Sequence, residues 1–315
     1  MSYERKMLED LAMPTRKEVE KALLRTLLKH GGVSKEFGIE QDIVDEIADD
    51  FGLNKRQRSA FLQTTYRKEN RIKKSLLWHR LLFRAADSLA KLKLVSRPTD
   101  TFLLTKRRDW MLTEKGFDNA LNFSGIPVTR KASLPVKSYE VQKIVNKMTE
   151  SHLPASYNPI DATQKTTKTT QKINLRLRGF RQAVIEAYDF RCAVCRLRIS
   201  SPDSLSWEVE AAHIVPHHLK GRDDIWNGLA LCHLHHWAFD IGWFTLHDNY
   251  SVKISQKIDS LPVDCGIIGG YEFVRALSRE RIRILLPDND AILPHPNAIR
   301  WHRQNVFYHE KKTEI

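Results

Sequence analysis

Residues 229–240 read LALCHLHHWAFD, and this stretch places one cysteine and three histidines side by side. Its first half is short and apolar, as in a buried strand, and its second half predicts a helix. The stretch follows Asn227-Gly228 and ends at Asp240. Potential metal ligands therefore gather where a strand passes into a helix. The sequence around them shows whether they serve one metal ion or two.

Four of the candidate ligands have the spacing of a structural zinc site. Cys192 and Cys195 form one C-x-x-C pair, and Cys232 and His235 form a second pair after a long insertion. Two such pairs supply the four ligands of a closed tetrahedral zinc centre. The alternative, that the thiols are merely buried and His235 lies on the surface, carries less weight. Cys265 stands alone and is expected to be a core thiol.

His236 and Asp240 remain for a second ion. They are four residues apart on the predicted helix and therefore share a face. An imidazole and a carboxylate so placed suit a harder divalent ion such as Mg²⁺, Mn²⁺ or Ni²⁺. Upstream, His213 lies in a predicted strand and Asn227 opens the next one. Glu210 in the first strand is interpreted as a salt-bridge partner more readily than as a support for a ligand.

The segments VEAAHIVPH, DDIWNGLALC and HLHHWAFDIGWFTL resemble HNH endonucleases, which have a ββα-metal fold. The resemblance spans roughly residues 178–310 and is strongest to the branch found in restriction and McrA-like proteins. It implies that His213 is the general base, that Asn227 orients the base loop or binds the metal, and that His236 is a metal ligand. Many members have a ligand where this chain has Ala212, and Asp240 is our candidate for that role.

Residues 15–120 predict a second unit. Thr15 and Glu18 form a capping box, and three predicted helices, the last over 75–91, precede the short apolar runs KLVS and TFLLT and then RRDWMLTEKG. Three helices followed by a basic β-hairpin describe a winged helix, whose third helix usually enters the major groove. The unit resembles the N-terminal domain of Mrr-type restriction proteins. The candidate DNA contacts are Trp78, Arg80, Arg84, Arg107, Arg108 and Trp110, although both indoles fit a core role as well.

Composition and charge agree with a nucleic-acid partner. The chain has 315 residues, a formal net charge of +13 and a pI of about 9.6, which favours a polyanionic partner. No run of about 18 apolar residues occurs, and the charged N-terminus lacks a signal-peptide core. We therefore expect a cytoplasmic protein that does not enter a membrane. Residues 122–177 predict a basic linker with one short helix around 139–150, either tracking phosphates or serving as a solvated spacer.

The sequence thus predicts an α+β protein with a winged helix over 1–121, the linker, and an HNH nuclease domain with structural zinc over 178–315. The expected function is endonucleolytic cleavage of double-stranded DNA by a one-metal mechanism. Because one ββα site cuts one strand, we expect a homodimer. The chain contains no methyltransferase, so restriction of modified DNA, with N6-methyladenine ahead of 5-methylcytosine, is the leading hypothesis. The alternatives are an ordinary restriction enzyme with a separate methyltransferase, a non-catalytic winged-helix regulator with a zinc module, and an RNA-directed or nicking nuclease.

Overall fold

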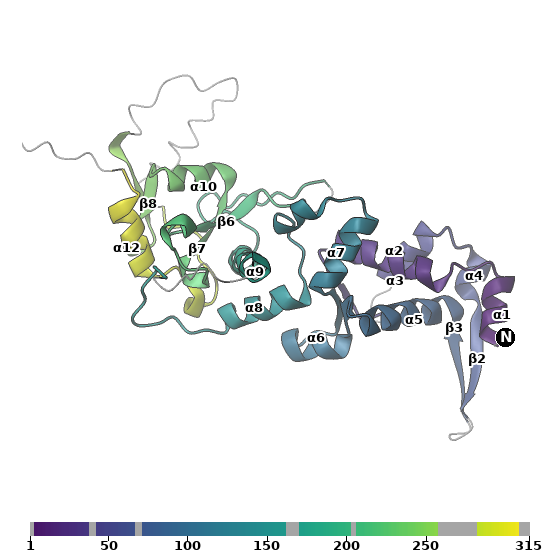
Figure 1. The fold of residues 1–315 in the computed structure, drawn as a ribbon. Helices are drawn as coiled ribbons and strands as arrows, with labels where there is room; N and C mark the ends of the chain where they lie inside the picture. Colours follow the sequence, from purple (N-terminus) through teal and green to yellow (C-terminus); the bar gives the residue numbers. More distant parts are fainter. Residues whose placement is uncertain are drawn as a thin grey trace, which may run out of the picture. The chain divides into compact units, whose positions relative to one another are not determined.

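The protein is described by a computed structural model that covers residues 3–37, 42–66, 71–161, 170–202, 206–257 and 282–308. The fold is mixed α+β (Figure 1). The chain divides into two compact units, Met1–Gln142 and Lys143–Ile315. Each unit is described by itself below. The boundary between them falls inside the segment predicted to be a linker. Cys265 lies outside the described residues.

The N-terminal unit is built around a helical core. Its helices are α1 (Tyr3–Asp10), α2 (Arg16–Lys29), α3 (Asp42–Asp50), α4 (Lys55–Ser59), α5 (Leu77–Lys91), α6 (Pro98–Thr105) and α7 (Glu114–Phe123). Helix α2 begins with the predicted capping box, in which Thr15 Oγ1 accepts from Glu18 N at 3.3 Å and Glu18 Oε2 accepts from Thr15 N at 2.7 Å. Helix α2 packs against α5 and α7 through buried leucines.

A small antiparallel sheet completes this unit. Its strands lie in the order β1 (Val33–Lys35), β5 (Asp109–Leu112) and β4 (Val95–Ser96). A separate hairpin pairs β2 (Phe61–Tyr66) with β3 (Arg71–Leu76). The prediction of a strand at TFLLT is wrong, because helix α6 begins at Pro98, whose fixed φ suits the first helical turn. The partner of β4 is therefore β5, farther along the chain.

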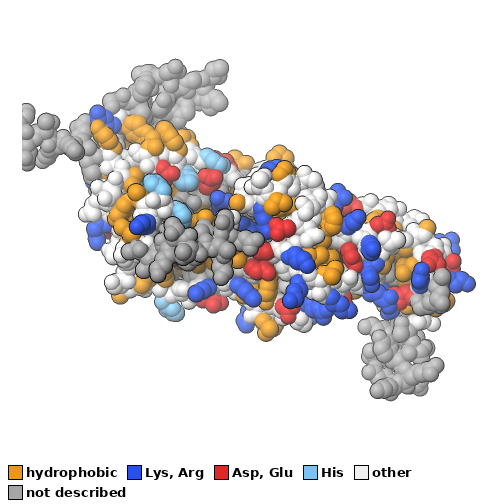
Figure 2. Space-filling view, in the orientation of Figure 1, with side chains coloured by type: hydrophobic (Ala, Val, Ile, Leu, Met, Phe, Trp, Pro, Cys, Tyr) orange, Lys and Arg blue, Asp and Glu red, His pale blue; other side chains and the backbone are white. Residues whose placement is uncertain are grey.

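Charged side chains of both signs cover the N-terminal unit. On the face seen in Figure 2, lysine and arginine side chains alternate with aspartate and glutamate rather than forming one continuous basic surface. The excess positive charge of the chain is thus not gathered into a single patch on this face.

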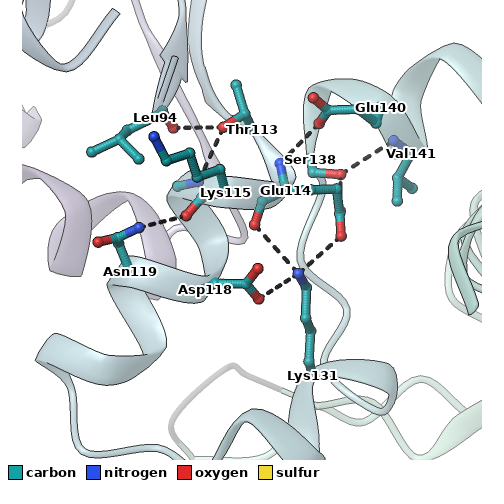
Figure 3. Close-up of polar contacts among 11 residues, drawn as sticks. Leu94, Thr113, Glu114, Lys115, Asp118, Asn119, Lys131, Ser138, Glu140 and Val141 are labelled. Carbon is teal, nitrogen blue, oxygen red and sulfur yellow. Dashed lines mark hydrogen bonds and ion pairs between the residues drawn. The ribbon is translucent and has the colours of Figure 1, made fainter. Parts of the chain in front are cut away.

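The first part of the predicted linker is folded onto α7. It contains η1 (Val128–Ala132) and α8 (Tyr139–Thr149), the latter close to the predicted helix at 139–150. Figure 3 shows Lys131 Nζ between the carboxylates of Glu114, at 3.0 Å, and Asp118, at 2.5 Å. Glu140 Oε2 accepts a hydrogen bond from Glu114 N at 2.9 Å. Residues 128–140 are therefore fastened to α7 and do not behave as a plain spacer.

Within the described residues, the C-terminal unit holds two antiparallel pairs of strands among its helices. Its elements are α9 (Thr170–Ala187), β6 (Val209–His213), η2 (His217–Leu219), η3 (Ile225–Asn227), β7 (Gly228–Cys232), α10 (His233–Asp240), β8 (Phe244–Leu246), β9 (Val252–Ile254), η5 (Asp290–Ile292) and α12 (Pro296–Asn305). Strands β6 and β7 are antiparallel, with His213 opposite Gly228. A Cβ at Gly228 would lie 2.3 Å from Val184 Cγ2 of α9, so this glycine allows α9 to pack directly on β7. The predicted strand–loop–strand–helix order is observed.

The second part of the predicted linker packs within the C-terminal unit. Tyr157 donates its hydroxyl hydrogen to Asp224 Oδ1 at 2.6 Å, and Asn297 Nδ2 donates to Tyr157 O at 2.9 Å. Arg222 N donates to Pro159 O at 3.0 Å. The low-complexity run at 163–172 lies mostly outside the described residues. Within those residues, no helix combines the length and apolar character needed to cross a membrane.

A buried histidine joins α12 to the rest of the C-terminal unit. His302 is 1 % exposed and stacks on Phe239 with the ring centroids 3.6 Å apart. Its Nδ1 lies 2.9 Å from Thr245 Oγ1 and its Nε2 lies 3.1 Å from Phe239 O. A neutral ring satisfies both contacts, donating from Nε2 and accepting at Nδ1. Burial lowers the pKa of His302 to about 4.

This histidine should make the stability of the C-terminal unit depend on pH. Its folded pKa is below the unfolded value of about 6.5, so its contribution is present above that value and is lost as the pH falls toward 4. Between about pH 7.5 and pH 5, the loss should be about 2 kcal/mol. Denaturant unfolding of wild type and His302→Gln at both pH values measures it. The variant should lose less stability on acidification, and an identical loss in both proteins would contradict the assignment.

Candidate zinc centre and active site

The four predicted zinc ligands meet at the start of α10. Their ligand atoms all lie within 4.8 Å of one another, and the four residues are Cys192, Cys195, Cys232 and His235. Cys232 Sγ lies 3.0 Å and Cys192 Sγ 3.6 Å from His235 Nδ1, and Cys195 Sγ lies 3.9 Å from Cys232 Sγ. Edges of about 3.5 to 4 Å suit a tetrahedral ion with Zn–S bonds of about 2.3 Å. In the part of the chain that the structure describes, this is the one cluster of such compactness.

The local backbone places the four ligands close to one another. Cys232 ends β7, and His235 lies in the first turn of α10. The other pair lies in a tight turn in which Arg196 has a φ of +62° and its N–H donates to Cys192 O at 2.8 Å. Ala193 N donates to Ala230 O at 2.7 Å, which joins this turn to β7. The cluster therefore connects the turn, the strand and the helix.

The charges of the thiols also favour a cation. Hydrogen bonds from Cys195 and Cys232 hold the pKa of the Cys192 thiol far below its usual range. In return, Cys192 raises the pKa of Cys195 to about 11 and raises that of Cys232 further. One thiolate is stabilised by its neighbours, and each additional thiolate is repelled by it. A zinc ion would remove this repulsion and allow all three to ionise.

Asn227 holds the loop that follows His213. This side chain is completely buried, and its Oδ1 accepts a hydrogen bond from Val215 N at 2.8 Å. Its Nδ2 donates to Val215 O at 3.1 Å and to Arg222 O at 2.9 Å. The amide therefore joins the two ends of the loop between β6 and η3. Of the two roles that the sequence left open for Asn227, these contacts support orientation of the base loop.

His236 lies between two carboxylates. Its Nδ1 is 2.9 Å from Glu210 Oε2 of β6, and its Nε2 is 3.5 Å from Asp240 Oδ2 one turn along α10. Burial opposes protonation of His236, but the Glu210 hydrogen bond and the Asp240 charge outweigh it and raise its pKa. The Glu210 contact thus orients the imidazole. Support of His236 by Glu210 was weighed below an ordinary salt bridge. The feature of the sequence that indicated it was the position of Glu210 on the strand beside α10.

The candidate base and the candidate ligands share one neighbourhood. Burial raises the pKa of Asp240, and the charges of His236, His213 and His218 act against that rise. Histidine side chains also gather on the face of the C-terminal unit seen in Figure 2. The imidazole nitrogen of His236 and the carboxylate of Asp240 fit Mg²⁺, Mn²⁺ or Ni²⁺. The negative charge of Glu210 and Asp240, which favours a proton on His236, also favours a divalent cation beside it.

Two of the six predicted DNA contacts are core residues. Trp78 is 2 % exposed, and its Nε1 donates to Val44 O at 3.1 Å. Trp110 is 6 % exposed and stacks on Phe37 with the ring centroids 5.4 Å apart. Neither indole is available at the surface of the folded unit. We therefore correct the prediction that these two residues contact DNA.

The four arginines lie in the same N-terminal unit and differ in their pairing. Arg80 and Arg84 both pair with Glu4 Oε2, at 3.0 and 2.8 Å. Arg108 Nη2 donates to Glu36 Oε1 at 3.0 Å. Arg107 is exposed, and within the described residues no ion pair involves it, although its charge acts on the carboxyl of Asp109. Arg107 is therefore the guanidinium most readily offered to a phosphate, because the other three would first have to leave their carboxylates.

We expect about one tightly bound zinc ion per chain, as a four-ligand closed site requires. Cys192→Ser should lower the zinc content and destabilise the C-terminal unit by at least about 3 kcal/mol, since metal binding and folding are coupled. Elemental analysis and thermal unfolding of the purified chain check both. Cys265→Ser, which removes the fourth cysteine, is the matched control and should keep its zinc. Freshly purified, folded wild type without zinc would refute the site.

Comparison with known proteins assigns the family of this region. The HNH endonuclease family model matches residues 192–247, which include the cysteine cluster, His213, Asn227, His236 and Asp240. Among solved structures, the "Modification dependent TagI restriction endonuclease" is 18% identical with a TM-score of 0.30, over 48% of this chain and 42% of that chain. This chain therefore spans less than half of that protein, and the likeness is too low to support an argument. A comparison with curated proteins gives no match. Residues 192–247 form an HNH endonuclease domain.

Proposed function

We propose that this chain is a restriction-type endonuclease that hydrolyses phosphodiester bonds in double-stranded DNA. The observation that carries the proposal is that β6, which ends at His213, packs against α10, which carries His236 and Asp240, inside the family-matched region. A general base beside a nitrogen–carboxylate pair is the minimum that one-metal hydrolysis of a phosphodiester needs. A non-catalytic regulator has no use for this combination.

Each residue has a distinct part in the proposed reaction. His213 removes a proton from the attacking water, and His236 and Asp240 hold a divalent ion. A bound Mg²⁺, Mn²⁺ or Ni²⁺ ion supplies Lewis-acid stabilisation of the phosphate charge and the leaving 3′ oxygen. Glu210 keeps the His236 ring in place through its 2.9 Å contact with Nδ1. The zinc at the cysteine cluster takes no part in the chemistry and holds the ends of β7 and α10 together.

Duplex DNA is the favoured substrate. In chain order, α2, β1, α3, α5, β4 and β5 match the order expected of a winged helix, with α4 and the β2–β3 hairpin inserted before α5 and α6 inserted before β5. This order supports that interpretation of the N-terminal unit. A recognition helix fits the major groove of DNA and not that of RNA, which is deep and narrow. The net charge of +13 suits a polyanion. Because one ββα centre cuts one strand, double-strand cleavage needs two centres, and we propose a homodimer.

Modification dependence is part of the proposal. A host must spare its own DNA, and an enzyme that cuts only modified sites does so without a partner methyltransferase. The resemblance of residues 15–120 to Mrr-type proteins supports this reading. A methyl group in the major groove is read by apolar contact. Because Trp78 and Trp110 are buried, we assign the methyl contact to neither, and N6-methyladenine remains ahead of 5-methylcytosine.

His213→Ala should nearly abolish nicking of supercoiled plasmid with Mg²⁺, Mn²⁺ or Ni²⁺. Loss of a general base lowers the rate by a factor of about 10² to 10⁴. DNA binding, measured by gel shift, should stay within about twofold of wild type, because the base is not a binding residue in this scheme. His247→Ala removes an exposed imidazole of the same unit and should cut like wild type. Near-normal cleavage by His213→Ala would remove His213 from the mechanism.

The substrate proposal is tested with one plasmid prepared in a methylating host and in a methylation-deficient host. We expect cleavage of the methylated DNA at least about tenfold faster, since a lost methyl contact in a specific site costs on the order of 1 kcal/mol or more. Remethylation of the unmodified plasmid in vitro with an adenine or a cytosine methyltransferase then identifies the base. Equal cleavage of both preparations would favour the ordinary sequence-specific restriction enzyme.

A further inference from the structure

A buried carboxylate lies against the candidate base and has no role in the mechanism described above. Asp223 is 4 % exposed, and its Oδ1 is 3.1 Å from His213 Nε2. Asp223 belongs to the loop between β6 and β7, ten residues after His213. It differs from Glu210, which contacts the other histidine of the site. A buried carboxylate that is hydrogen-bonded to the candidate base can affect the reaction only through that base.

Two further nitrogen-bearing side chains share this carboxylate with His213. His217 Nε2 lies 3.7 Å from Asp223 Oδ1, and Arg176 Nε of α9 lies 3.5 Å from Oδ2. Both oxygens thus face donors, as a buried carboxylate requires. The arginine compensates the charge of Asp223, which leaves Oδ1 to accept a hydrogen bond from the ring of His213. A carboxylate without a proton can only accept.

The backbone around Asp223 is fixed on both sides. Arg222 O, immediately before it, accepts from the buried amide of Asn227 at 2.9 Å. Asp224, immediately after it, is held by Tyr157 at 2.6 Å and by Arg222 Nε at 2.9 Å. A Cβ at Gly221 would lie 1.8 Å from Val215 O, so the loop closes tightly on its own start. These anchors place the Asp223 carboxylate independently of any substrate.

The other side of the His213 ring is held by packing. The ring stacks on Phe180 of α9 with centroids 4.1 Å apart and planes 22° apart. The His217 ring lies 5.7 Å away, and Asp240 of α10 is near enough to interact with the charge of His213. Within the described residues, Nε2 has the Asp223 partner and Nδ1 makes no hydrogen bond. The imidazole thus has one nitrogen committed and one available.

We propose that Asp223 is a positioning residue that holds His213 as the Nε2–H tautomer and leaves Nδ1 to accept the proton from the attacking water. A neutral imidazole has one donor and one acceptor nitrogen, and an acceptor fixed at one nitrogen selects the tautomer. In the step that follows, the water proton moves to Nδ1, the water oxygen bonds to phosphorus, and the bond to the 3′ oxygen breaks. The 3′ oxygen leaves with the electron pair of that bond and takes a proton from solvent. Asp223 then stabilises the imidazolium, as carboxylates behind catalytic histidines do.

The tautomer is directly measurable without any activity. The full chain, loaded with zinc and labelled with ¹⁵N-histidine, is examined by NMR at about pH 8, and His213→Gln identifies the His213 signals. We expect the Nε2–H form in wild type and a mixture of forms in Asp223→Asn, because an amide can donate as well as accept. The Nδ1–H form in wild type would overturn the proposal, whether or not any variant folds.

The kinetic arm rests on the proposed function. Asp223→Asn should lower the cleavage rate constant at saturating DNA by about 10- to 100-fold and leave KM unchanged, as loss of an orienting partner does. Asp223→Glu should recover part of the rate, and Asp248→Asn, a surface carboxylate paired with Arg303, should cut normally. In a His213→Ala background, Asp223→Asn should have no further effect, because it acts through that ring.

The two arms separate the possible failures. If wild type cuts no DNA while His213 shows the Nε2–H tautomer, the proposed function fails and the positioning role stands. If wild type cuts DNA and Asp223→Asn cuts at the same rate with an unchanged tautomer, the positioning role fails and the nuclease assignment stands.

Discussion

The active site depends on how the start of α10 is held. This helix has eight residues, and its N-cap residue Cys232 makes no side-chain capping hydrogen bond. A helix so short is marginal by itself in water. The clustered ligands Cys232 and His235 join its first turn to β7 and, through Cys192, to the turn after α9. The positions of His236 and Asp240 therefore depend on a ligand cluster that suits zinc and takes no part in the proposed chemistry.

In the proposed function, one short stretch serves two kinds of ion because its candidate ligands differ in direction and in softness. Successive helix residues point about 100° apart, so His235 turns toward the sulfurs while His236 turns toward Glu210 and Asp240. Thiolates select zinc, whereas carboxylates suit the harder ions that act on phosphates. In the proposed mechanism, Glu210 supports the ligand His236 and Asp223 supports the base His213. The site is thus two imidazoles, each held by its own carboxylate.

Sequence alone predicted the ligand cluster, the strand–loop–strand–helix order and the positions of His213 and His236, because these follow from spacing within a strand–helix unit. It could not assign Asp223 or Glu210, since each contact joins separate segments and depends on how the loop or the strands close. The same limit explains the errors. Trp78 is buried because the apolar face of α5 is wider than the spacing of its leucines suggested. Residues 128–140 are held by carboxylates of α7. Pro98 started a helix where β-propensity favoured a strand.

Residues 232–240 hold ligands of two proposed metal sites of different kinds. The most direct measurement is a titration of the zinc-loaded full chain with Mn²⁺, followed by electron paramagnetic resonance. About one exchangeable Mn²⁺ ion should bind per chain, more weakly than zinc, as hard ions at partly exposed sites do. His236→Ala combined with Asp240→Asn should abolish this binding while the zinc content stays unchanged. Undiminished Mn²⁺ binding in that variant would show that His236 and Asp240 do not form the second metal site.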